Sequence, residues 1–340
     1  MRVSPEPNNN MKFSLSSLAR LIAEPVIQQV TGVAGRQFAS SLRQIENLMI
    51  LQGRTLALQN ADRAPLDCLQ DAEFKVFSQY GEDGILQHLI RETGIDRGEQ
   101  TFVEFGVQDY LESNTRFLLQ GDHWRGLIID GSREYMEGVR RSDIYWRNDL
   151  TAIAAWIDRD NINSLIGDSG FTGNIGILSV DIDGNDYWIW EKIDVVNPVI
   201  VVAEWNSVFG PNHAVSIPYA REFDRATAHY SCLYWGASMR AFEELGARKG
   251  YALVGSNRVG NNIFFVRRDR LGRLKPLTTR EAYVESRFRD SRDRQGNLNF
   301  LGGTRRYEEI KHLPVVDVNS GQVTTLNDLD ATQENKAQTR

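Results

Sequence analysis

The stretch Thr101-Phe-Val-Glu-Phe-Gly-Val107 decides the fold. It is a short apolar run that ends beside polar residues, and a helical pattern over residues 112–120 follows it. Four further runs of this kind lie at residues 126–130, 144–149, 175–181 and 199–205, with helical segments between them, for example at 161–166 and 187–193. Continuous apolar runs joined by helices are typical of buried parallel strands. The pattern therefore predicts an α/β fold with a doubly wound, mostly parallel sheet.

The alternation stops after the fifth run. A helix predicted over residues 237–249 ends at Gly250, and two apolar runs follow at 251–255 and 262–267. The segment between these two runs is too short for a parallel crossover, so they predict an antiparallel hairpin. Parallel strands followed by a late hairpin give the seven-stranded layout of the class I methyltransferase sheet, whereas nicotinamide-binding sheets normally finish parallel.

The regions outside this sheet differ from it in composition. Residues 1–11 are predicted to be a disordered tail, residues 12–64 a helical extension, residues 65–270 the α/β domain and residues 271–340 a basic extension. In the helical extension Pro25 interrupts a first segment, and Gly32 and Gly35 separate it from a second, which predicts a helical hairpin. This hairpin would mediate self-association, fold back onto the domain, or lie on a membrane surface.

Composition excludes several classes of protein. Of the 340 residues, 41% are hydrophobic and 25% charged, which is typical of a globular chain. The formal charge of −6 argues against a nucleic-acid-binding surface, two cysteines are too few for a disulfide framework, and no apolar run is long enough to span a bilayer. We therefore expect a cytoplasmic location. Residues 267–306 carry a local charge of +7. This segment is either a solvated, partly mobile arm or a contact for phosphate or acidic glycans.

Acidic and amide residues close the predicted strands. In an open parallel sheet, ligands bind outside the carboxyl ends of the strands, near the point where the strand order reverses. Clustered carboxylates repel one another and lose hydration, so a purely structural sheet has no need of them. The residues of interest, in chain order, are Glu104, Gly106, Gln108, Asp109, Asp130, Asp149, Asp181, Asp183, Asp186, Glu204 and Asn206.

The first loop suits one cofactor better than another. Only Gly106 stands where a backbone must approach a ligand closely, while Gln108 and Tyr110 occupy the later positions of a dinucleotide fingerprint. Bulky residues there obstruct a pyrophosphate, which disfavours NAD. S-adenosylmethionine has no phosphate and needs an acid for its ribose, which Asp130 supplies; alternatively, Asp130 caps the following helix.

The loop Asp181-Ile-Asp183-Gly-Asn-Asp186 predicts a cation site. Asp181 and Asp183 alternate on one side of an extended chain, and Glu204 and Asn206 end the next strand. Oxygen ligands of this kind suit Mg²⁺, which could hold two substrate hydroxyls and lower the pKa of one. The alternative is structural: Asn185 or Asp186 caps a helix, and Asn206 holds a turn.

Residues outside the strand ends could complete the site. His213 and His229 follow the fifth strand, where an imidazole could act as the general base; they are also ordinary loop residues in many proteins. Gln79 and Tyr80 precede a helix whose first turn holds Glu82 and Asp83, and they could cover the cofactor.

Several motifs resemble a known family. They are Ser78-Gln-Tyr-Gly-Glu-Asp-Gly-Ile85, Phe102-Val-Glu-Phe-Gly-Val107, Glu112-Ser-Asn-Thr115, Asp181-Ile-Asp-Gly-Asn-Asp186, Glu204-Trp-Asn-Ser-Val-Phe-Gly210 and Lys249-Gly-Tyr251. Over residues 75–270 the chain resembles bacterial FkbM-like class I S-adenosylmethionine-dependent methyltransferases, which are often associated with polysaccharide or secondary-metabolite pathways. The resemblance implies that Glu104 and Gly106 line the amino-acid end of the cofactor and that Asp130 holds its ribose. Asp181, Glu204 and Asn206 look similar to the ligands of metal-dependent sugar and catechol methyltransferases.

The sequence thus predicts an S-adenosylmethionine-dependent O-methyltransferase that acts on a sugar or other polyol, with Mg²⁺ as a candidate second cofactor. Two alternatives stay open: a metal-dependent transferase or hydrolase of a nucleotide-activated sugar, and a non-catalytic scaffold in a glycan-assembly complex. The candidate catalytic residues are His213, His229 and Asp181. The candidate cofactor-binding residues are Gln79, Tyr80, Glu104, Gly106, Gln108, Asp130, Asp149 and Asp183. The candidate metal ligands are Asp181, Asp183, Glu204 and Asn206.

Overall fold

The computed structural model of the protein describes residues 15–63 and 66–338. The chain divides into two compact units, residues 1–51 and 52–340. The predicted tail at residues 1–11 lies outside the described residues. None of the helices in the described part of the chain combines the length and the apolar character needed to cross a bilayer.

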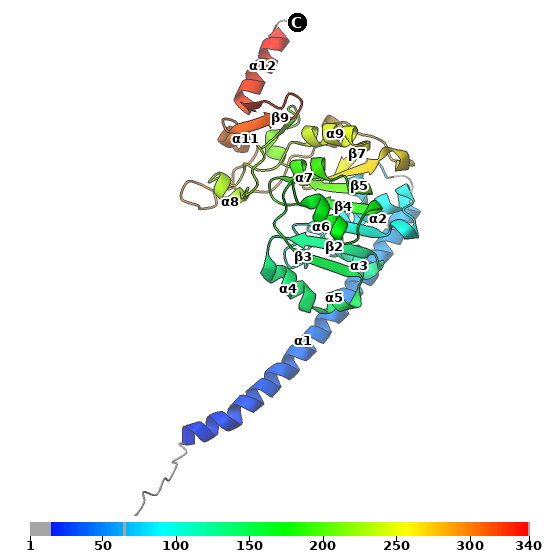
Figure 1. The fold of residues 1–340 in the computed structure, drawn as a ribbon, viewed down its shortest axis with the longest axis vertical. Helices are drawn as coiled ribbons and strands as arrows, with labels where there is room; N and C mark the ends of the chain where they lie inside the picture. The colour runs from blue at the N-terminus through cyan, green and yellow to red at the C-terminus, as the bar shows by residue number, and fades with distance from the viewer. Residues whose placement is uncertain (1–14, 64–65, 339–340) are drawn as a thin grey trace, which may run out of the picture. The chain divides into compact units, whose positions relative to one another are not determined.

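The strands form two sheets (Figure 1). The seven-stranded sheet has the order β3-β2-β1-β4-β5-β8-β7, and the three-stranded sheet has the order β10-β9-β6. The strands are β1 (Thr101–Phe105), β2 (Arg125–Asp130), β3 (Leu150–Ala154), β4 (Gly173–Val180), β5 (Val196–Glu204), β6 (Val215–Ser216), β7 (Tyr251–Ser256), β8 (Asn262–Arg267), β9 (Pro314–Asp317) and β10 (Val323–Thr325).

Helices connect the strands of the large sheet. The helices are α1 (Leu15–Asp62), α2 (Glu82–Thr93), α3 (Arg116–Gly121), α4 (Arg133–Arg141), α5 (Asp143–Arg147), α6 (Ile162–Asp168), α7 (Asp186–Lys192), α8 (Arg225–Ala228), α9 (Met239–Arg248), α10 (Thr279–Ala282), α11 (Thr304–Ile310) and α12 (Leu326–Gln338).

The large sheet has the predicted class I methyltransferase topology. β1 to β5 pair in parallel, while β8 runs antiparallel to both β5 and β7, as expected for the late hairpin. Chain order reverses between β1 and β4, so the site expected by the strand-end rule lies at the carboxyl ends of these strands.

The two faces of the sheet bury separate cores. Val103 and Leu178 point to one face, where they pack with residues of α6, α7 and α9 such as Trp190. Phe102 and Ile177, their immediate neighbours in sequence, point to the other face, where residues of α2, α3 and α4 cover them. Successive side chains of a strand alternate between faces, and both sets here are apolar, so the sheet is covered on both sides.

Two sequence predictions are wrong in detail. Residues 144–149 do not form the third strand: residues 143–147 form α5, and β3 begins at Leu150. The predicted helical hairpin is one continuous helix, α1, which runs through Pro25, Gly32 and Gly35. Self-association through this helix and contact with a membrane or a glycan-assembly complex stay predictions.

The basic C-terminal segment is part of the folded body rather than a loosely attached arm. Arg270 makes a two-pronged ion pair with Glu99, with N–O distances of 2.7 and 2.9 Å. Arg306 is buried and donates to the backbone oxygens of Phe288 and Ser286. Strand β9 pairs antiparallel with β6, which lies in the segment between β5 and α8. Basic side chains in this segment are therefore used in tertiary contacts.

Asp83 shows how the segment before β1 is built. Its Oδ2 accepts hydrogen bonds from the backbone N–H groups of Val76, Phe77 and Ser78, at 2.7 to 2.8 Å, and from the Ser78 hydroxyl. Burial raises the pKa of Asp83 to about 6, although these hydrogen bonds oppose the shift. The side chain therefore contributes to the pH dependence of stability.

We expect the free energy of unfolding to fall as the pH rises from about 4 to 7. The folded state binds the Asp83 proton more tightly than the unfolded chain does. This contribution is therefore fully present below the unfolded pKa of 3.8 and is lost as the pH rises through about 6. Its size is on the order of 3 kcal/mol. The free energy of unfolding, measured by urea denaturation at several pH values, should change less steeply with pH in Asp83→Asn than in the wild-type protein. Asp67→Asn, at an exposed position, should keep the wild-type dependence on pH. Equal slopes in all three proteins would contradict the assignment.

Candidate active site at the strand ends

Two adjoining cavities lie at the carboxyl ends of the parallel strands. The first, the β2–β3 cavity, has a volume of about 560 Å³ and includes Asp130 and Trp156 in its wall. The second, the β4–β5 cavity, has a volume of about 360 Å³ and includes Glu104 and Glu204. Both cavities are lined by Gly106, Gln108, Asp181, Asp183, Arg225 and Asp290. The strand ends therefore meet at one site, as the parallel topology requires.

Glu104 at the end of β1 organises the loop that follows it. Its buried carboxylate accepts hydrogen bonds from the Ser113 hydroxyl (2.6 Å), the Asn114 N–H (2.9 Å), and the N–H and hydroxyl of Thr115. Burial raises the pKa of Glu104, and these hydrogen bonds oppose the shift. Glu104 thus fixes the wall of the β4–β5 cavity, which is a structural role not anticipated from the sequence.

The first loop passes very close to β4. Gly106 has a φ of +70°, and a Cβ atom added there would lie 1.7 Å from the carbonyl oxygen of Asp181. Gln108 and Tyr110 also adopt positive φ values, of 48° and 61°. Tyr110 is buried in the core, where its hydroxyl contacts Thr115 Oγ1 at 3.0 Å. Tyr110 therefore packs into the core and lines neither cavity, so this position does not need a glycine.

Asp130 at the end of β2 is held in place by two backbone groups. The Gln108 N–H and the Ser132 N–H each donate to one of its carboxylate oxygens at 2.7 Å. It lines the β2–β3 cavity together with the aromatic side chains of Trp156 and Phe223. A carboxylate beside aromatic walls suits a hydroxyl-bearing group joined to a planar ring.

Asp149 was predicted to follow the third strand, but the strand begins after it. Asp149 precedes β3 and lies at the amino end of the strand, where it pairs loosely with Arg125 at 3.9 Å. It therefore does not belong to the site. The residues that follow β3, Ala155 to Ile157, line the β2–β3 cavity instead. Correct placement of the third strand would have revealed Trp156.

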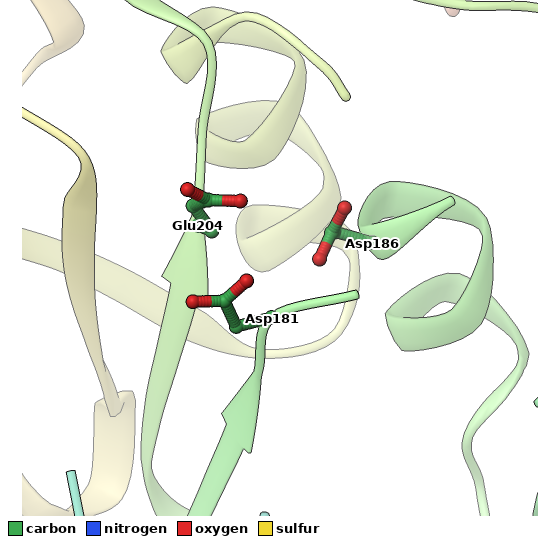
Figure 2. A group of neighbouring side chains, drawn as sticks. All are labelled: Asp181, Asp186 and Glu204. Carbon is green, nitrogen blue, oxygen red and sulfur yellow. The ribbon is translucent and has the colours of Figure 1, made fainter. Parts of the chain in front are cut away.

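Three acidic groups meet at the ends of β4 and β5. Figure 2 shows the carboxyl groups of Asp181, Asp186 and Glu204 near one another, and one oxygen of each lies within 4.8 Å of the other two. Burial, followed by the charges of neighbouring acids, raises the pKa of Asp181 and of Glu204 well above their ordinary values. Two buried carboxylates this close repel each other, so the pair favours a state in which one of them is protonated.

Two of the predicted metal ligands have other partners. Asp183 accepts a hydrogen bond from Arg225 at 3.1 Å. Asn206 donates from its amide to the carbonyl oxygens of Leu233 and Trp235 and accepts from the Val208 N–H. It thereby holds a turn, which was the structural alternative.

Asp186 joins the acidic group although the sequence did not assign it as a ligand. Its two carboxylate oxygens accept from the N–H groups of Ile182 and Gly184. Asp181 and Glu204 are therefore the acids best placed to receive a cation in this part of the chain.

The two histidines are not at the site. His213 Nε2 lies 2.8 Å from Asp330 Oδ1 and faces a separate cavity of about 410 Å³. His229 contacts the Ser231 hydroxyl and packs against Tyr230. Neither is among the described residues that line the two strand-end cavities, so the prediction of a histidine base there is wrong. Asp181, the third predicted catalytic residue, lines both.

The residues predicted to cover the cofactor differ in placement. Gln79 lines the β4–β5 cavity and accepts a hydrogen bond from Asn261. Tyr80 packs edge-on against Phe288, with ring centroids 5.3 Å apart, and Phe288 lines the cavity. Tyr80 therefore supports the wall from behind.

Arg225 is a site residue that sequence reasoning missed. Its guanidinium pairs with Asp183 and with Asp290, at 3.1 and 2.8 Å, and lies over the Trp235 ring at 4.6 Å. It lines both cavities. A single arginine outside any motif gives no sequence signal, and its role depends on contacts with residues far along the chain.

Neither the known protein families nor the curated proteins contain a match. Similar solved structures include an O-methyltransferase from Bacillus cereus in complex with SAH, at 13% identity, 64% coverage of this chain, 90% of that chain and a TM-score of 0.36. The N-terminal domain of EvdMO1 with SAH bound is 11% identical, with 68% of this chain and 97% of that chain covered and a TM-score of 0.38. The O-methyltransferase TomG from Streptomyces achromogenes in complex with SAM is 15% identical, with 61% of this chain and 92% of that chain covered and a TM-score of 0.35.

Proposed function

We propose that this chain is an S-adenosylmethionine-dependent O-methyltransferase that acts on a sugar or other polyol, as in the FkbM-like proteins it resembles. The observation that carries the proposal is the pair of adjoining cavities at the point where strand order reverses. A methyl transfer needs two binding sites that meet at one point, so that donor and acceptor react in line. The shared wall at Gly106 and Asp181 supplies that point.

The β2–β3 cavity fits the nucleoside half of the cofactor. Asp130 would accept hydrogen bonds from ribose hydroxyls, and Trp156 and Phe223 would pack against the adenine ring. The absence of a side chain at Gly106 allows the first loop to approach the Asp181 carbonyl oxygen closely, at the point where the two cavities adjoin. When bound there, S-adenosylmethionine would supply an electrophilic methyl group.

The acidic pair fits the reacting end of the site. Asp181 and Glu204 line the β4–β5 cavity, and an ionised Asp181 would favour a sulfonium cation and accept the proton of an acceptor hydroxyl. Mg²⁺ is the second part of the proposal. Asp181 and Glu204 would hold the ion, with waters completing its shell, and the ion would lower the pKa of a substrate hydroxyl.

Replacement of Asp130 by alanine tests the proposal. We expect the wild-type protein to bind S-adenosylmethionine in a calorimetric titration, and Asp130→Ala to weaken binding by about 1 to 3 kcal/mol, since a hydrogen-bond partner of the ribose is lost. This loss corresponds to about 5- to 150-fold in Kd. Asp149→Ala, an exposed acid at the opposite end of β3, is the matched control and should leave Kd unchanged.

The same titration with and without Mg²⁺ separates the alternatives. Failure of the wild-type protein to bind the cofactor contradicts the proposal. Mg²⁺ binding in that case would favour a metal-dependent transferase or hydrolase of a nucleotide-activated sugar. Binding of neither would favour a scaffold. Equal affinities of Asp130→Ala and the wild-type protein would remove Asp130 from the ribose site.

A further inference from the structure

Glu204 and Asn262 face the β4–β5 cavity side by side. They are directly opposite each other where β5 and β8 pair antiparallel, so their side chains point to the same face of the sheet. Both line the cavity, and only 9% of Glu204 and 3% of Asn262 is exposed. Two polar side chains are therefore buried together in the wall of this cavity.

Each of these side chains has an acceptor atom that is not used. Within residues 66–338, Glu204 Oε2 and Asn262 Oδ1 are buried and have no hydrogen-bond partner. Leaving a buried acceptor unsatisfied costs about 1 to 3 kcal/mol, so folded proteins seldom contain two together without a reason. Both atoms can accept a hydrogen bond from a ligand hydroxyl.

The orientation of the Asn262 amide is fixed by its other atom. Nδ2 donates to Glu82 Oε1 at 3.1 Å. A flipped amide would place its oxygen against that carboxylate, which is repulsive. Glu82 is itself held, since its Oε2 accepts from the N–H groups of Tyr80 and Gly81 and its Oε1 accepts from Asn257. Asn262 must therefore present its oxygen, and not its N–H₂ group, to a ligand.

We propose that Glu204 and Asn262 are specificity-determining residues that select an acceptor with two adjacent hydroxyl groups, the vicinal diol of a sugar ring. The two unused acceptor atoms would receive one hydrogen bond from each hydroxyl. The buried Nε1 of Trp205, which also lacks a partner among the residues described, would donate to an oxygen of the same ring. Trp235 and Phe288 in the same wall supply apolar surface for that ring. This inference rests on the proposed function and deepens it.

A pair of sugars that differ in one hydroxyl tests the inference. The probes are methyl α-mannopyranoside, which has vicinal diols at carbons 2 and 3 and at carbons 3 and 4, and its 3-deoxy analogue, which has none. Binding of each is measured by titration of the full chain saturated with S-adenosylhomocysteine, in EDTA and in Mg²⁺. We expect the wild-type protein to prefer the diol about ten-fold or more. Asn262→Leu and Glu204→Gln should each reduce this preference to less than about two-fold. The affinity for S-adenosylhomocysteine should not change.

Two variants and a control separate binding from folding. Asn262→Leu also removes the hydrogen bond to Glu82, whereas Glu204→Gln leaves that bond in place and turns one acceptor atom into a donor. Asn163→Leu removes a structural amide far from the cavities, which binds the Lys192 carbonyl oxygen and the Asp194 N–H, and should leave sugar preference intact.

Several outcomes would overturn the inference. The first is that the wild-type protein binds the two sugars equally or binds neither. The second is that binding of the diol requires Mg²⁺ and is unchanged in Asn262→Leu. The third is that Asn262→Leu loses affinity for S-adenosylhomocysteine. The last result would assign the pair to the ammonium group of the cofactor. Failure of the wild-type protein to bind S-adenosylhomocysteine at all would instead contradict the proposed function.

Discussion

Gly106→Ala is expected to lower the free energy of unfolding by about 2 to 6 kcal/mol and to abolish detectable cofactor binding. The added methyl group would lie 1.7 Å from the Asp181 carbonyl oxygen, and the backbone at this position has a φ of +70°. Steric overlap and backbone strain act together, and separation of β1 from β4 would relieve the first only by displacing Asp181. Urea denaturation and calorimetric titration with S-adenosylhomocysteine measure the two effects.

Gly138→Ala is the matched control for this experiment. Gly138 lies within α4, and nothing surrounds the position of its missing Cβ within 4 Å. Alanine there should stabilise the protein by about 0.5 to 1 kcal/mol, because glycine is a poor helix former. A Gly106→Ala protein as stable as the wild type, with normal cofactor affinity, would show that β1 and β4 do not approach as closely as described.

Glu104→Ala is expected to lower the free energy of unfolding by about 3 to 5 kcal/mol. The buried carboxylate satisfies donors from Ser113, Asn114 and Thr115, and alanine would leave these donors unpaired in the core. The loop from Tyr110 to Arg116 would lose its attachment to β1, and the wall of the β4–β5 cavity would become mobile. Denaturation gives the energy, and amide hydrogen exchange over residues 110–116 locates it.

Glu112→Ala serves as the comparison for Glu104→Ala. Glu112 lies in the same loop, but its side chain is half exposed and pairs with Lys75 at 3.0 Å. Exposed ion pairs contribute about 0 to 1 kcal/mol, so this change should be nearly neutral. If the two substitutions destabilise the protein equally, the role assigned to Glu104 is wrong.

The sheet and the acidic strand ends could be predicted because both follow from local patterns. Runs such as Ile175 to Val180 are apolar on both faces, and parallel strands bring their carboxyl ends to the same edge. The third strand was misplaced because Ile144, Tyr145 and Trp146 favour a strand by propensity, while β3 contains two alanines. Tertiary packing overrides such weak preferences.

Long-range contacts explain what could not be predicted. Nothing local shows that Glu82 orients Asn262, which is 180 residues away, or that Arg225 joins Asp183 to Asp290. The histidines were assigned by their position after the fifth strand, but loops can turn a residue in any direction. His213 is directed to Asp330 near the end of the chain.

The contribution of Asp290 to both cavities has a consequence for protein engineering. This residue belongs to the segment after β8, and it forms an ion pair with Arg225 of α8, which also lines both cavities. If the loop around α8 were replaced by that of a homologue without the matching segment after β8, Asp290 could lose its ion-pair partner Arg225. Chimeras that exchange acceptor preference must therefore transplant both pieces as a unit.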